Sequence, residues 1–243
     1  MRLLIVRHGD PDYDHDSLTE KGFREAELLS EKLKKEKLDY IYVSPMGRAQ
    51  RTAEPTLKKL GKTALTCEWL REFSPQIMRP DVTEKKMIVW DWLPQDWLAD
   101  PAYADPARWC DTEIMKAGHV REEYEWVIRN FDQVLAFHGY VRDGEAYRVE
   151  KENQDTLVFF CHFGLQCVLL SHLMNVSPMT LWHFTSAAPS SVTTIYTEER
   201  REGMAVFRIN SYGDQSHLYA GGEKPSFAAR FCENYHNAEQ RHD

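Results

Sequence analysis

The stretch "LLIVRHGDPDY", residues 3–13, decides the fold that this sequence predicts. Its first four residues are apolar, which is typical of a short buried strand in a parallel sheet. The run ends abruptly in Arg7, His8 and Gly9, followed by acidic residues and a proline. Because an unpartnered polar group is costly at the end of a buried strand, we expect Arg7 and His8 to have a function there.

Strands and helices alternate along the remaining chain. The expected strands are 3–6, 38–45, 63–70, 155–162, 190–199 and 203–212, and the expected helices are 17–35, 46–61, 119–141 and 164–174. Thr19 is expected to cap the first helix, and Ser44 and Pro45 are expected to start the second. The second helix should kink or end near Pro55 and stop at Gly61. This alternation predicts an α/β fold whose largely parallel sheet carries helices on both faces.

Residues 75–118 have a different character, with recurring prolines and no strong periodicity. Five tryptophans gather in or just after this segment, at Trp90, Trp92, Trp97, Trp109 and Trp126. A linker lacks such aromatic content, so we expect a tryptophan-rich insertion, or cap, over about 75–130, packed over the active site. We treat 1–243 as a single domain, and residues 221–243 as a tail without an assigned structure.

Composition narrows the class of partner. The net charge is −8 and the isoelectric point is near 5.7, so long-range attraction to nucleic acid or an anionic membrane is not expected. No apolar run approaches the roughly 18 to 20 residues that cross a bilayer, and the short apolar start runs straight into charge, unlike a signal peptide. The expected partner is a small molecule; the oligomeric state, including a homo-oligomer, stays open.

The cysteine pattern indicates a reducing compartment. The five cysteines are Cys67, Cys110, Cys161, Cys167 and Cys232. Their odd number and mostly apolar context favour reduced thiols and a cytoplasmic location. The spacing of Cys161, His162, Cys167 and His172 fits no standard zinc-ligand pattern, and no metal is expected.

Three expected strand-to-helix junctions deliver charged or titratable groups. They carry Arg7 and His8, then Arg48, then His162. If the strands are parallel neighbours, these groups meet at one sheet edge, where binding sites gather in such folds. Two arginines, two histidines and two helix N-termini suit a tetrahedral oxyanion such as phosphate.

The same cluster predicts a reaction. Nearby arginine charge disfavours a protonated imidazole, so His8 is expected to be a neutral nucleophile that attacks phosphorus. Glu72 follows the third strand and could supply a proton to the leaving group, although surface pairing with Arg71 is the plainer interpretation, and Glu68 and Glu84 lie nearby. Five other histidines are interpreted as structural or surface residues: His15, His119, His138, His236 and His242.

These residues resemble the histidine phosphatase superfamily, which contains the phosphoglycerate mutases. The matching segments are "RHG" at 7–9, "LTEKG" at 18–22, "SPMGRAQRTA" at 44–53, "VFFCHFG" at 158–164, "APSSVTTI" at 188–195 and "YGDQSHL" at 212–218. The resemblance implies a three-layer α/β/α sandwich with a mostly parallel central sheet and no metal or other cofactor.

Carried onto this chain, the resemblance also implies roles. His8 would carry the phosphoryl group, Glu72 would be the proton donor and His162 would act beside them. Arg7 and Arg48 would bind the substrate phosphate, and Gly9 and Phe163 complete the predicted binding set. Two positions depart from the family pattern: Phe163 separates His162 from Gly164, and Asp14 stands where mutases have an asparagine.

Three functions are compatible with this pattern. The favoured one is a metal-independent phosphomonoester hydrolase of the histidine acid phosphatase type, acting on a small organic phosphate through a phosphohistidine. A phosphoglycerate mutase is the alternative, but the glutamate of mutases is followed by an Arg-His-Tyr-Gly type stretch, whereas this chain has "LREFSPQIMRP" at 70–80. The third, a non-catalytic phosphate-binding protein, is disfavoured because His8, Arg7, Arg48 and His162 are all present.

Overall fold

The computed structural model describes residues 1–226 and 233–237. Its centre is an eight-stranded sheet in the order β5-β4-β10-β1-β11-β12-β9-β8. The first four strands in that order are mutually parallel: β5 (Leu65–Thr66), β4 (Tyr40–Val43), β10 (Thr156–Cys161) and β1 (Arg2–Arg7). The other four continue the sheet with antiparallel pairing: β11 (Val192–Arg201), β12 (Met204–Asp214), β9 (Ala146–Val149) and β8 (Tyr140–Asp143).

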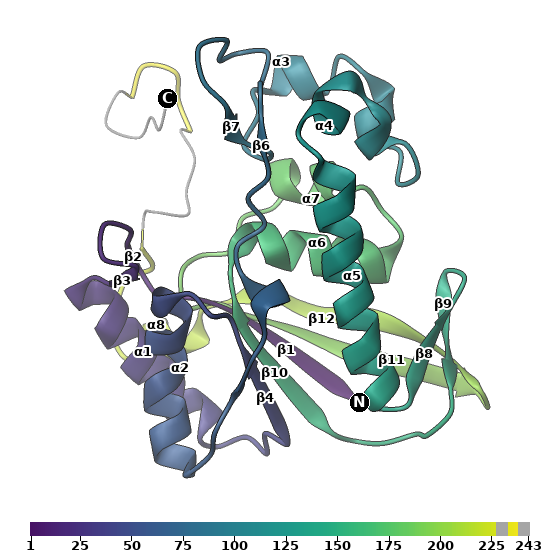
Figure 1. The fold of residues 1–243 in the computed structure, drawn as a ribbon. Helices are drawn as coiled ribbons and strands as arrows, with labels where there is room; N and C mark the ends of the chain where they lie inside the picture. Colours follow the sequence, from purple (N-terminus) through teal and green to yellow (C-terminus); the bar gives the residue numbers. More distant parts are fainter. Residues whose placement is uncertain (227–232, 238–243) are drawn as a thin grey trace.

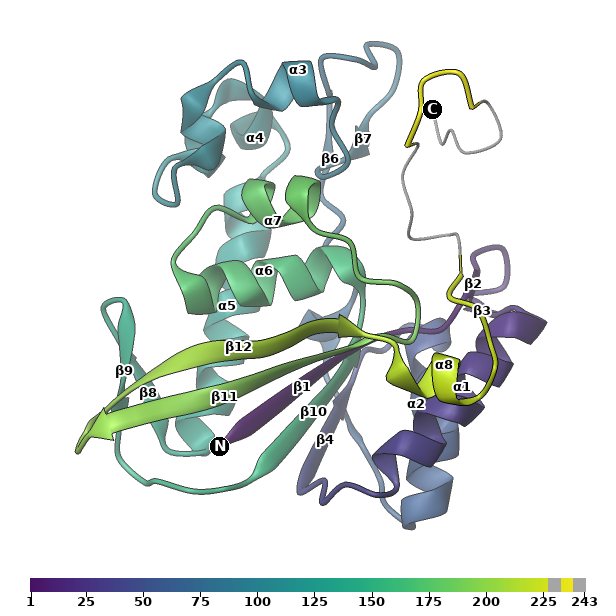
Figure 2. The same ribbon diagram turned by 180° about the vertical axis from the view of Figure 1, so that it is seen from behind.

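Helices cover both faces of this sheet (Figures 1 and 2). One face carries α1 (Glu20–Leu33) and α2 (Gly47–Leu60), and the other carries α5 (Val120–Phe137) and α6 (Phe163–Met174). The alternation of β1 divides the core accordingly, because Leu4 and Val6 join the cluster on the α1/α2 side and Leu3 and Ile5 join the other. The expected three-layer α/β fold is confirmed.

The start of α1 is fixed as the sequence predicts. The Thr19 side chain accepts a hydrogen bond from the Gly22 N–H at 3.1 Å and caps the helix. A side chain at Gly22 would meet the Asp10 carbonyl oxygen at 2.2 Å, and one at Gly9 would meet the Gly22 carbonyl oxygen at 2.8 Å. The segment after His8 therefore lies directly on the first turn of α1, an approach that only glycine permits.

The boundaries of α2 differ from the prediction. The helix begins at Gly47 after an N-cap at Met46, so Ser44 is not its cap. The helix continues past Pro55 to Leu60 and stops at Gly61, whose φ is +60°. Pro55 has no N–H, so the Arg51 carbonyl lacks its usual partner within the helix. Arg51 lies on the exposed side of the helix, where water can bind that carbonyl.

Two further boundaries are corrected by the structure. The helix expected to continue to 141 ends at Phe137, because Gly139 turns the chain with φ +92° into a hairpin of β8 and β9. The strand expected over 63–70 is only the two residues of β5, followed by a 3₁₀ turn at Glu68–Leu70.

The segment between β5 and α5 holds short elements only. They are β6 (Gln76–Ile77), β7 (Met87–Ile88), α3 (Pro94–Trp97), α4 (Glu113–Ala117) and 3₁₀ turns at Pro101–Ala104 and Trp109–Asp111. Figure 2 shows α3 and α4 beyond α7 (Pro178–Phe184), on the side away from the sheet. Trp92, Trp97 and Trp109 are buried, and the Trp109 and Trp182 rings meet edge to face at 5.7 Å. That residues 75–130 form a cap distinct from the rest of the domain stays a prediction.

Smaller elements complete the described chain. A hairpin of β2 (Pro11–Asp12) and β3 (Ser17–Leu18) follows β1, and α8 (Ser216–Ala220) packs beside α1. Beyond α8, Glu223 pairs with Lys21 and Arg24 of α1. The predicted tail lies partly outside the described residues, at 227–232 and 238–243.

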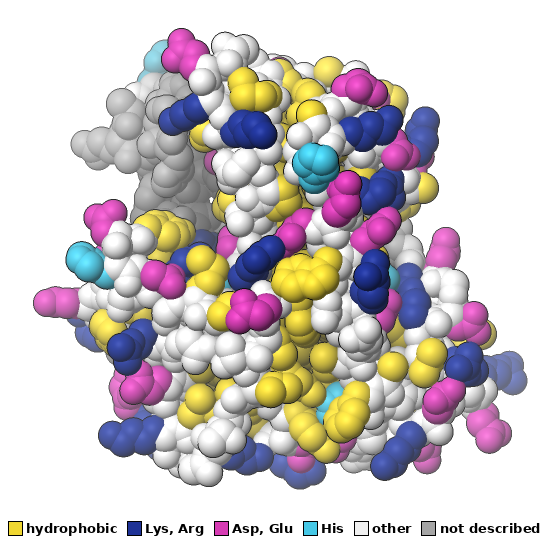
Figure 3. All heavy atoms as spheres, viewed as in Figure 1, with side chains coloured by type: hydrophobic (Ala, Val, Ile, Leu, Met, Phe, Trp, Pro, Cys, Tyr) yellow, Lys and Arg dark blue, Asp and Glu magenta, His cyan; other side chains and the backbone are white. Residues whose placement is uncertain are grey.

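The surface and the helices bear on the expected partners. Figure 3 shows cationic and anionic side chains interspersed over one face, with no extended patch of one sign. Among residues 1–226 and 233–237, no helix has the length and apolar character needed to cross a bilayer.

Candidate active site

The parallel register of β1 and β10 places both predicted histidines together. Arg7 pairs with Cys161, so the next residues along the two strands, His8 and His162, leave the sheet side by side. The His8 N–H donates to the Cys161 carbonyl at 2.9 Å, and the two imidazole rings are 5.1 Å apart between centroids. The two junctions therefore converge as the sequence predicts.

His8 is held as a neutral imidazole with a defined tautomer. Its Nδ1 lies 2.8 Å from the Gly9 carbonyl oxygen, which can only accept, so Nδ1 carries the proton and Nε2 keeps its lone pair. Burial, followed by the positive charges of Arg7 and Arg48, lowers the pKa of His8 well below 6.5. This is the state of a nitrogen nucleophile.

His162 is oriented by Ser44. The Ser44 Oγ accepts the Met46 N–H at 3.2 Å and lies 2.8 Å from His162 Nε2. A hydroxyl that already accepts one hydrogen bond can donate its own proton to Nε2, which leaves the proton of His162 on Nδ1. Nδ1 is buried without a hydrogen-bond partner among the described residues, and in this tautomer it is a donor available to an oxyanion.

Two buried guanidinium groups add further donors. Arg7 Nη1 donates to the Ala187 carbonyl at 2.6 Å, and its guanidinium lies 5.5 Å from the centroid of the Phe163 ring. Arg48 Nη1 pairs with Asp16 at 2.7 Å, and the Tyr13 ring lies 5.4 Å from its guanidinium carbon. The Nε of each arginine is buried without a partner in the described part of the chain, as expected of a phosphate clamp.

Glu72 is fixed near this cluster by main-chain donors. Its Oε1 accepts the Phe73 N–H at 2.8 Å and the Leu165 N–H, in the first turn of α6, at 2.9 Å. Burial raises the pKa of Glu72, while those two N–H groups and Arg7 and Arg48 oppose the rise. A carboxylic acid that keeps its proton to higher pH is suited to protonate a leaving group. The plainer surface role is not observed, because Arg71 pairs with Glu123 instead.

The insertion reaches the same corner through Trp90. Its indole Nε1 donates to the Phe73 carbonyl at 2.8 Å, and its ring meets Phe163 edge to face at 6.0 Å. A side chain at Gly164 would meet that indole nitrogen at 2.4 Å and Glu72 Oε1 at 2.8 Å. The extra Phe163 thus forms the wall beside Arg7, while Gly164 makes room for the indole and the carboxylate.

Gly9 contributes differently from the other predicted binding residues. Its N–H donates to Thr52 Oγ1 at 2.9 Å, and that hydroxyl donates to the Arg48 carbonyl at 2.8 Å. The N–H of Gly9 is therefore engaged by the protein, and its contribution to the site is the missing side chain that lets it lie on Gly22.

Sequence reasoning missed Asp16, Ser44 as a histidine partner, and Thr52 as a brace. Asp16 is the last acid of "DPDYDHD", 10–16, and its Oδ2 also accepts the Gly47 N–H at 2.6 Å. The predicted stand-in for the mutase asparagine, Asp14, is exposed. Ser44 and Thr52 both stand in the "SPMGRAQRTA" motif, which was the signal that could have identified them.

The histidines predicted to be structural have other partners where the structure describes them. His15 binds Asp12, His119 lies by Glu122, and His138 binds the Tyr42 hydroxyl. His236 is exposed, and His242 lies outside the described residues. His172 of the rejected zinc set binds Asp132, and the described residues form no cluster of three or more potential metal ligands.

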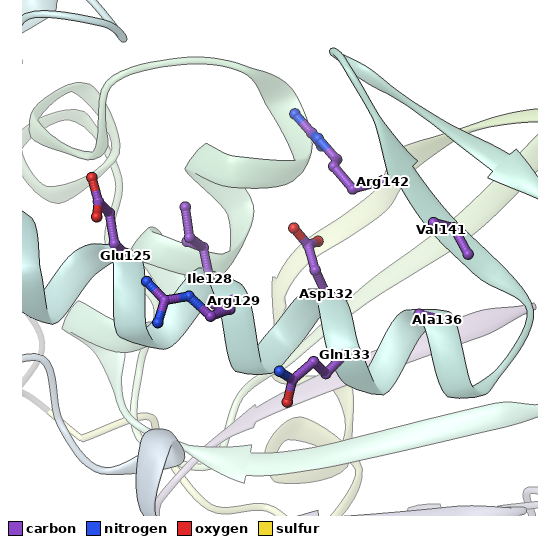
Figure 4. Close-up of a pocket in the computed structure, with 8 residues that line it drawn as sticks. All are labelled: Glu125, Ile128, Arg129, Asp132, Gln133, Ala136, Val141 and Arg142. Carbon is purple, nitrogen blue, oxygen red and sulfur yellow. The ribbon is translucent and has the colours of Figure 1, made fainter.

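A hollow of about 480 Å³ lies elsewhere, between α5 and β8 (Figure 4). Its lining residues are Glu125, Ile128, Arg129, Asp132, Gln133, Ala136, Val141 and Arg142. The Asp132 carboxylate is engaged by His172 and Tyr147, and Arg142 by the carbonyls of Gly144 and His172. It contains none of the catalytic candidates.

Comparison with known proteins identifies the family. The model of the histidine phosphatase superfamily (branch 1) matches residues 3–210, and the chain belongs to that superfamily. The expectation of an enzyme that acts on phosphate esters is confirmed with it.

Relatives and solved structures agree with this assignment. An adenosylcobalamin/alpha-ribazole phosphatase of Salmonella typhi is 23% identical over 193 residues, which cover 76% of this chain and 85% of that protein. Phosphoserine phosphatase 1 of Hydrogenobacter thermophilus is 22% identical and covers 86% of this chain and 92% of its own. A structure of Entamoeba histolytica phosphoserine phosphatase with phosphoserine shares the fold, with a TM-score of 0.56 and 17% identity over 89% of this chain and 98% of that one.

Removing the Ser44 hydroxyl should impair catalysis more than folding. In Ser44→Ala, His162 Nε2 loses its donor and the tautomer with a proton on Nδ1 is no longer favoured. We expect kcat/KM to fall about 10- to 100-fold, since a lost buried hydrogen bond of about 1–3 kcal/mol is transmitted to the transition state. The matched control is Ser171→Ala, another buried serine, whose hydroxyl donates to the Val168 carbonyl. Equal losses of activity in both variants would contradict the assignment.

Acid should destabilise the fold through the two site histidines. The folded pKa of each is lowered well below 6.5, so between the two values the unfolded chain binds more protons than the folded one. The free energy of unfolding therefore falls as pH drops below about 6.5. Between pH 7 and pH 5, the free energy of unfolding, measured by urea denaturation, should fall by about 2 kcal/mol more in the wild type than in His8→Gln. Parallel pH profiles would show that His8 is not held neutral.

Proposed function

We propose that this member of the histidine phosphatase superfamily hydrolyses a small organic phosphomonoester through a phosphohistidine at His8, without a metal. In this proposal it is a phosphoric monoester hydrolase of the histidine acid phosphatase type. The observation that carries it concerns the described residues, 1–226 and 233–237. Among them, a neutral, buried His8 keeps its Nε2 free, and Arg7 Nε, Arg48 Nε and His162 Nδ1 lack a partner. One nucleophile and three converging donors match the needs of phosphoryl transfer.

The first step transfers the phosphoryl group to the protein. His8 Nε2 forms a bond to phosphorus while the bond from phosphorus to the ester oxygen breaks. Glu72 gives its proton to the departing alkoxide, and the two guanidinium groups and His162 Nδ1 stabilise charge on the non-bridging oxygens.

The second step returns the protein to its starting state. Glu72, now a carboxylate, takes a proton from water, whose oxygen bonds to phosphorus as the bond to His8 Nε2 breaks. Inorganic phosphate leaves, His8 is neutral again and Glu72 is again protonated. Its raised pKa supports both roles, because the group must exchange a proton near working pH.

The surroundings of the site favour hydrolysis over mutase chemistry. Apolar rings of Phe163 and Trp90 lie beside the clamp and the acid, which suits a substrate with some apolar surface.

The cytoplasm remains the predicted location. Cys110, Cys161 and Cys167 are free and buried, and Cys67 is free and partly exposed.

The test of this function is phosphate release from a panel of phosphomonoesters in chelating buffer. We expect the wild type to release phosphate, and His8→Ala to lose at least about a thousandfold, because the nucleophile is gone. His119→Ala, an exposed histidine outside the site, is the matched control. Undiminished release by His8→Ala would place the reaction elsewhere.

The role of Glu72 predicts a dependence on the leaving group. In Glu72→Gln, esters of poorly acidic alcohols, such as glycerol 3-phosphate, should lose about 100-fold or more in kcat, because their alkoxide needs the proton. With 4-nitrophenyl phosphate, whose leaving group needs no proton, formation of the phosphohistidine should be nearly unchanged in a rapid-quench burst. Equal loss for both esters would mean that Glu72 does not act as the acid.

A further inference from the structure

The phosphate clamp contains a carboxylate that the reaction does not use. Asp16 Oδ1 accepts a hydrogen bond from Arg48 Nη1 at 2.7 Å, and its Oδ2 accepts the Gly47 N–H, at the start of α2, at 2.6 Å. The Asp16 side chain is 45% exposed, whereas that of Arg48 is 8% exposed. One of the two clamp arginines thus carries a fixed counter-charge that faces solvent.

The backbone holds Asp16 in this place. Its φ is +45°, a left-handed conformation that side chains other than glycine rarely adopt. A side chain at Gly47 would meet the Asp16 carbonyl oxygen at 2.2 Å, so the loop and the start of α2 are in direct contact. The position of the carboxylate is therefore built into the chain path and does not depend on the ion pair alone.

The loop that carries Asp16 is acidic throughout. Residues 10–16, "DPDYDHD", contain four aspartates and no lysine or arginine. The Tyr13 ring of the same loop lies against the Arg48 guanidinium, which places this loop at the rim of the clamp.

The two arginines on either side of Glu72 along the chain, Arg71 and Arg79, are engaged elsewhere. Arg71 pairs with Glu123, and its guanidinium lies 4.9 Å from the Trp126 ring centroid. Arg79 forms two hydrogen bonds to Asp81, at 3.1 and 2.7 Å, and another to the Asp91 carbonyl. Neither guanidinium is left to receive a second acidic group of a substrate.

Resting on the proposed function, we propose that Asp16 is a specificity-determining residue that restricts the enzyme to phosphomonoesters whose alcohol carries no second acidic group. Its negative charge repels the phosphate group of every ester that enters the clamp, so this repulsion does not distinguish one ester from another. A carboxylate or second phosphate on the alcohol meets an additional repulsion, with no unengaged Arg71 or Arg79 to offset it. Phosphorylated sugars, polyols and amino alcohols fit this class, whereas phosphoglycerates and bisphosphates do not.

The test uses two substrates of nearly equal shape. Glycerol 3-phosphate and 3-phosphoglycerate differ in one terminal group, a hydroxymethyl in the first and a carboxylate in the second. We expect the wild type to prefer glycerol 3-phosphate by at least about tenfold in kcat/KM. In Asp16→Asn this ratio should shrink about fivefold, the effect of one like-charge pair roughly 8 Å apart at an effective dielectric of about 40.

The control is Asp14→Asn, which removes the same charge from the same loop at an exposed residue. It should leave the ratio within about twofold of the wild type, because within the described residues Asp14, unlike Asp16, forms no ion pair or hydrogen bond with a clamp arginine, and its exposed charge is screened by salt. If Asp16→Asn weakens both substrates equally, Asp16 only positions Arg48 and the proposal is wrong. A wild type that prefers 3-phosphoglycerate would overturn it as well.

Binding separates this proposal from the function on which it rests. Calorimetric dissociation constants of both compounds are measured with His8→Ala and with His8→Ala/Asp16→Asn, where no turnover intervenes. Tighter binding of glycerol 3-phosphate by His8→Ala, and a smaller difference between the two affinities in the double variant, support the role of Asp16 even if no hydrolysis is found. The absence of hydrolysis would contradict only the phosphatase proposal. Equal affinities in His8→Ala contradict the role of Asp16, whatever the activity.

Discussion

The site depends on the parallel pairing of β1 with β10. Because Arg7 is aligned with Cys161, the two strands leave the sheet together, and His8 and His162 follow at the same edge. A shift of one residue in this register would send each side chain of one strand to the opposite face of the sheet and separate the histidines. Both strands are fully covered, which gives this register its strength: Leu3 and Ile5 face one core and Leu4 and Val6 the other.

The polar groups gathered there lose favourable hydration on burial, and the main chain compensates three of them, His8, Arg7 and Glu72, whereas side chains hold Arg48 and His162. The Gly9 carbonyl sets the tautomer of His8, the Ala187 carbonyl holds Arg7, and two N–H groups hold Glu72. Main-chain partners change little with side-chain motion, so the site is ordered before a substrate binds. Little of the binding energy is then lost to rearrangement of the site. Within the described residues, Arg7 Nε, Arg48 Nε and His162 Nδ1 remain without a partner in this cluster.

Much of this was accessible from sequence for a simple reason. Apolar strands that stop at a charged pair are conspicuous, and the carboxyl ends of parallel strands meet, so Arg7, His8, Arg48 and His162 could be placed together without coordinates. Asp16 and Ser44 could not, because their partners depend on the path of the loop and on where α2 begins. The expected N-cap, Ser44, lies two residues before the observed one, Met46. The β8–β9 hairpin was missed because the preceding helix was extended through Gly139 to residue 141, although Asp143-Gly144 between 140–142 and 146–149 is typical of a hairpin turn.

The two bonds made by the Phe73 backbone have a consequence of their own. Its N–H donates to the carboxylate of Glu72 and its carbonyl accepts from the indole of Trp90, so this one residue joins the proposed acid to the insertion. Any replacement in the insertion that tilts this indole also alters the hydrogen bond that opposes the rise in the pKa of Glu72. On the proposed mechanism, selectivity and pH optimum are therefore coupled, and we expect a variant selected for a bulkier alcohol to have a shifted pH optimum as well.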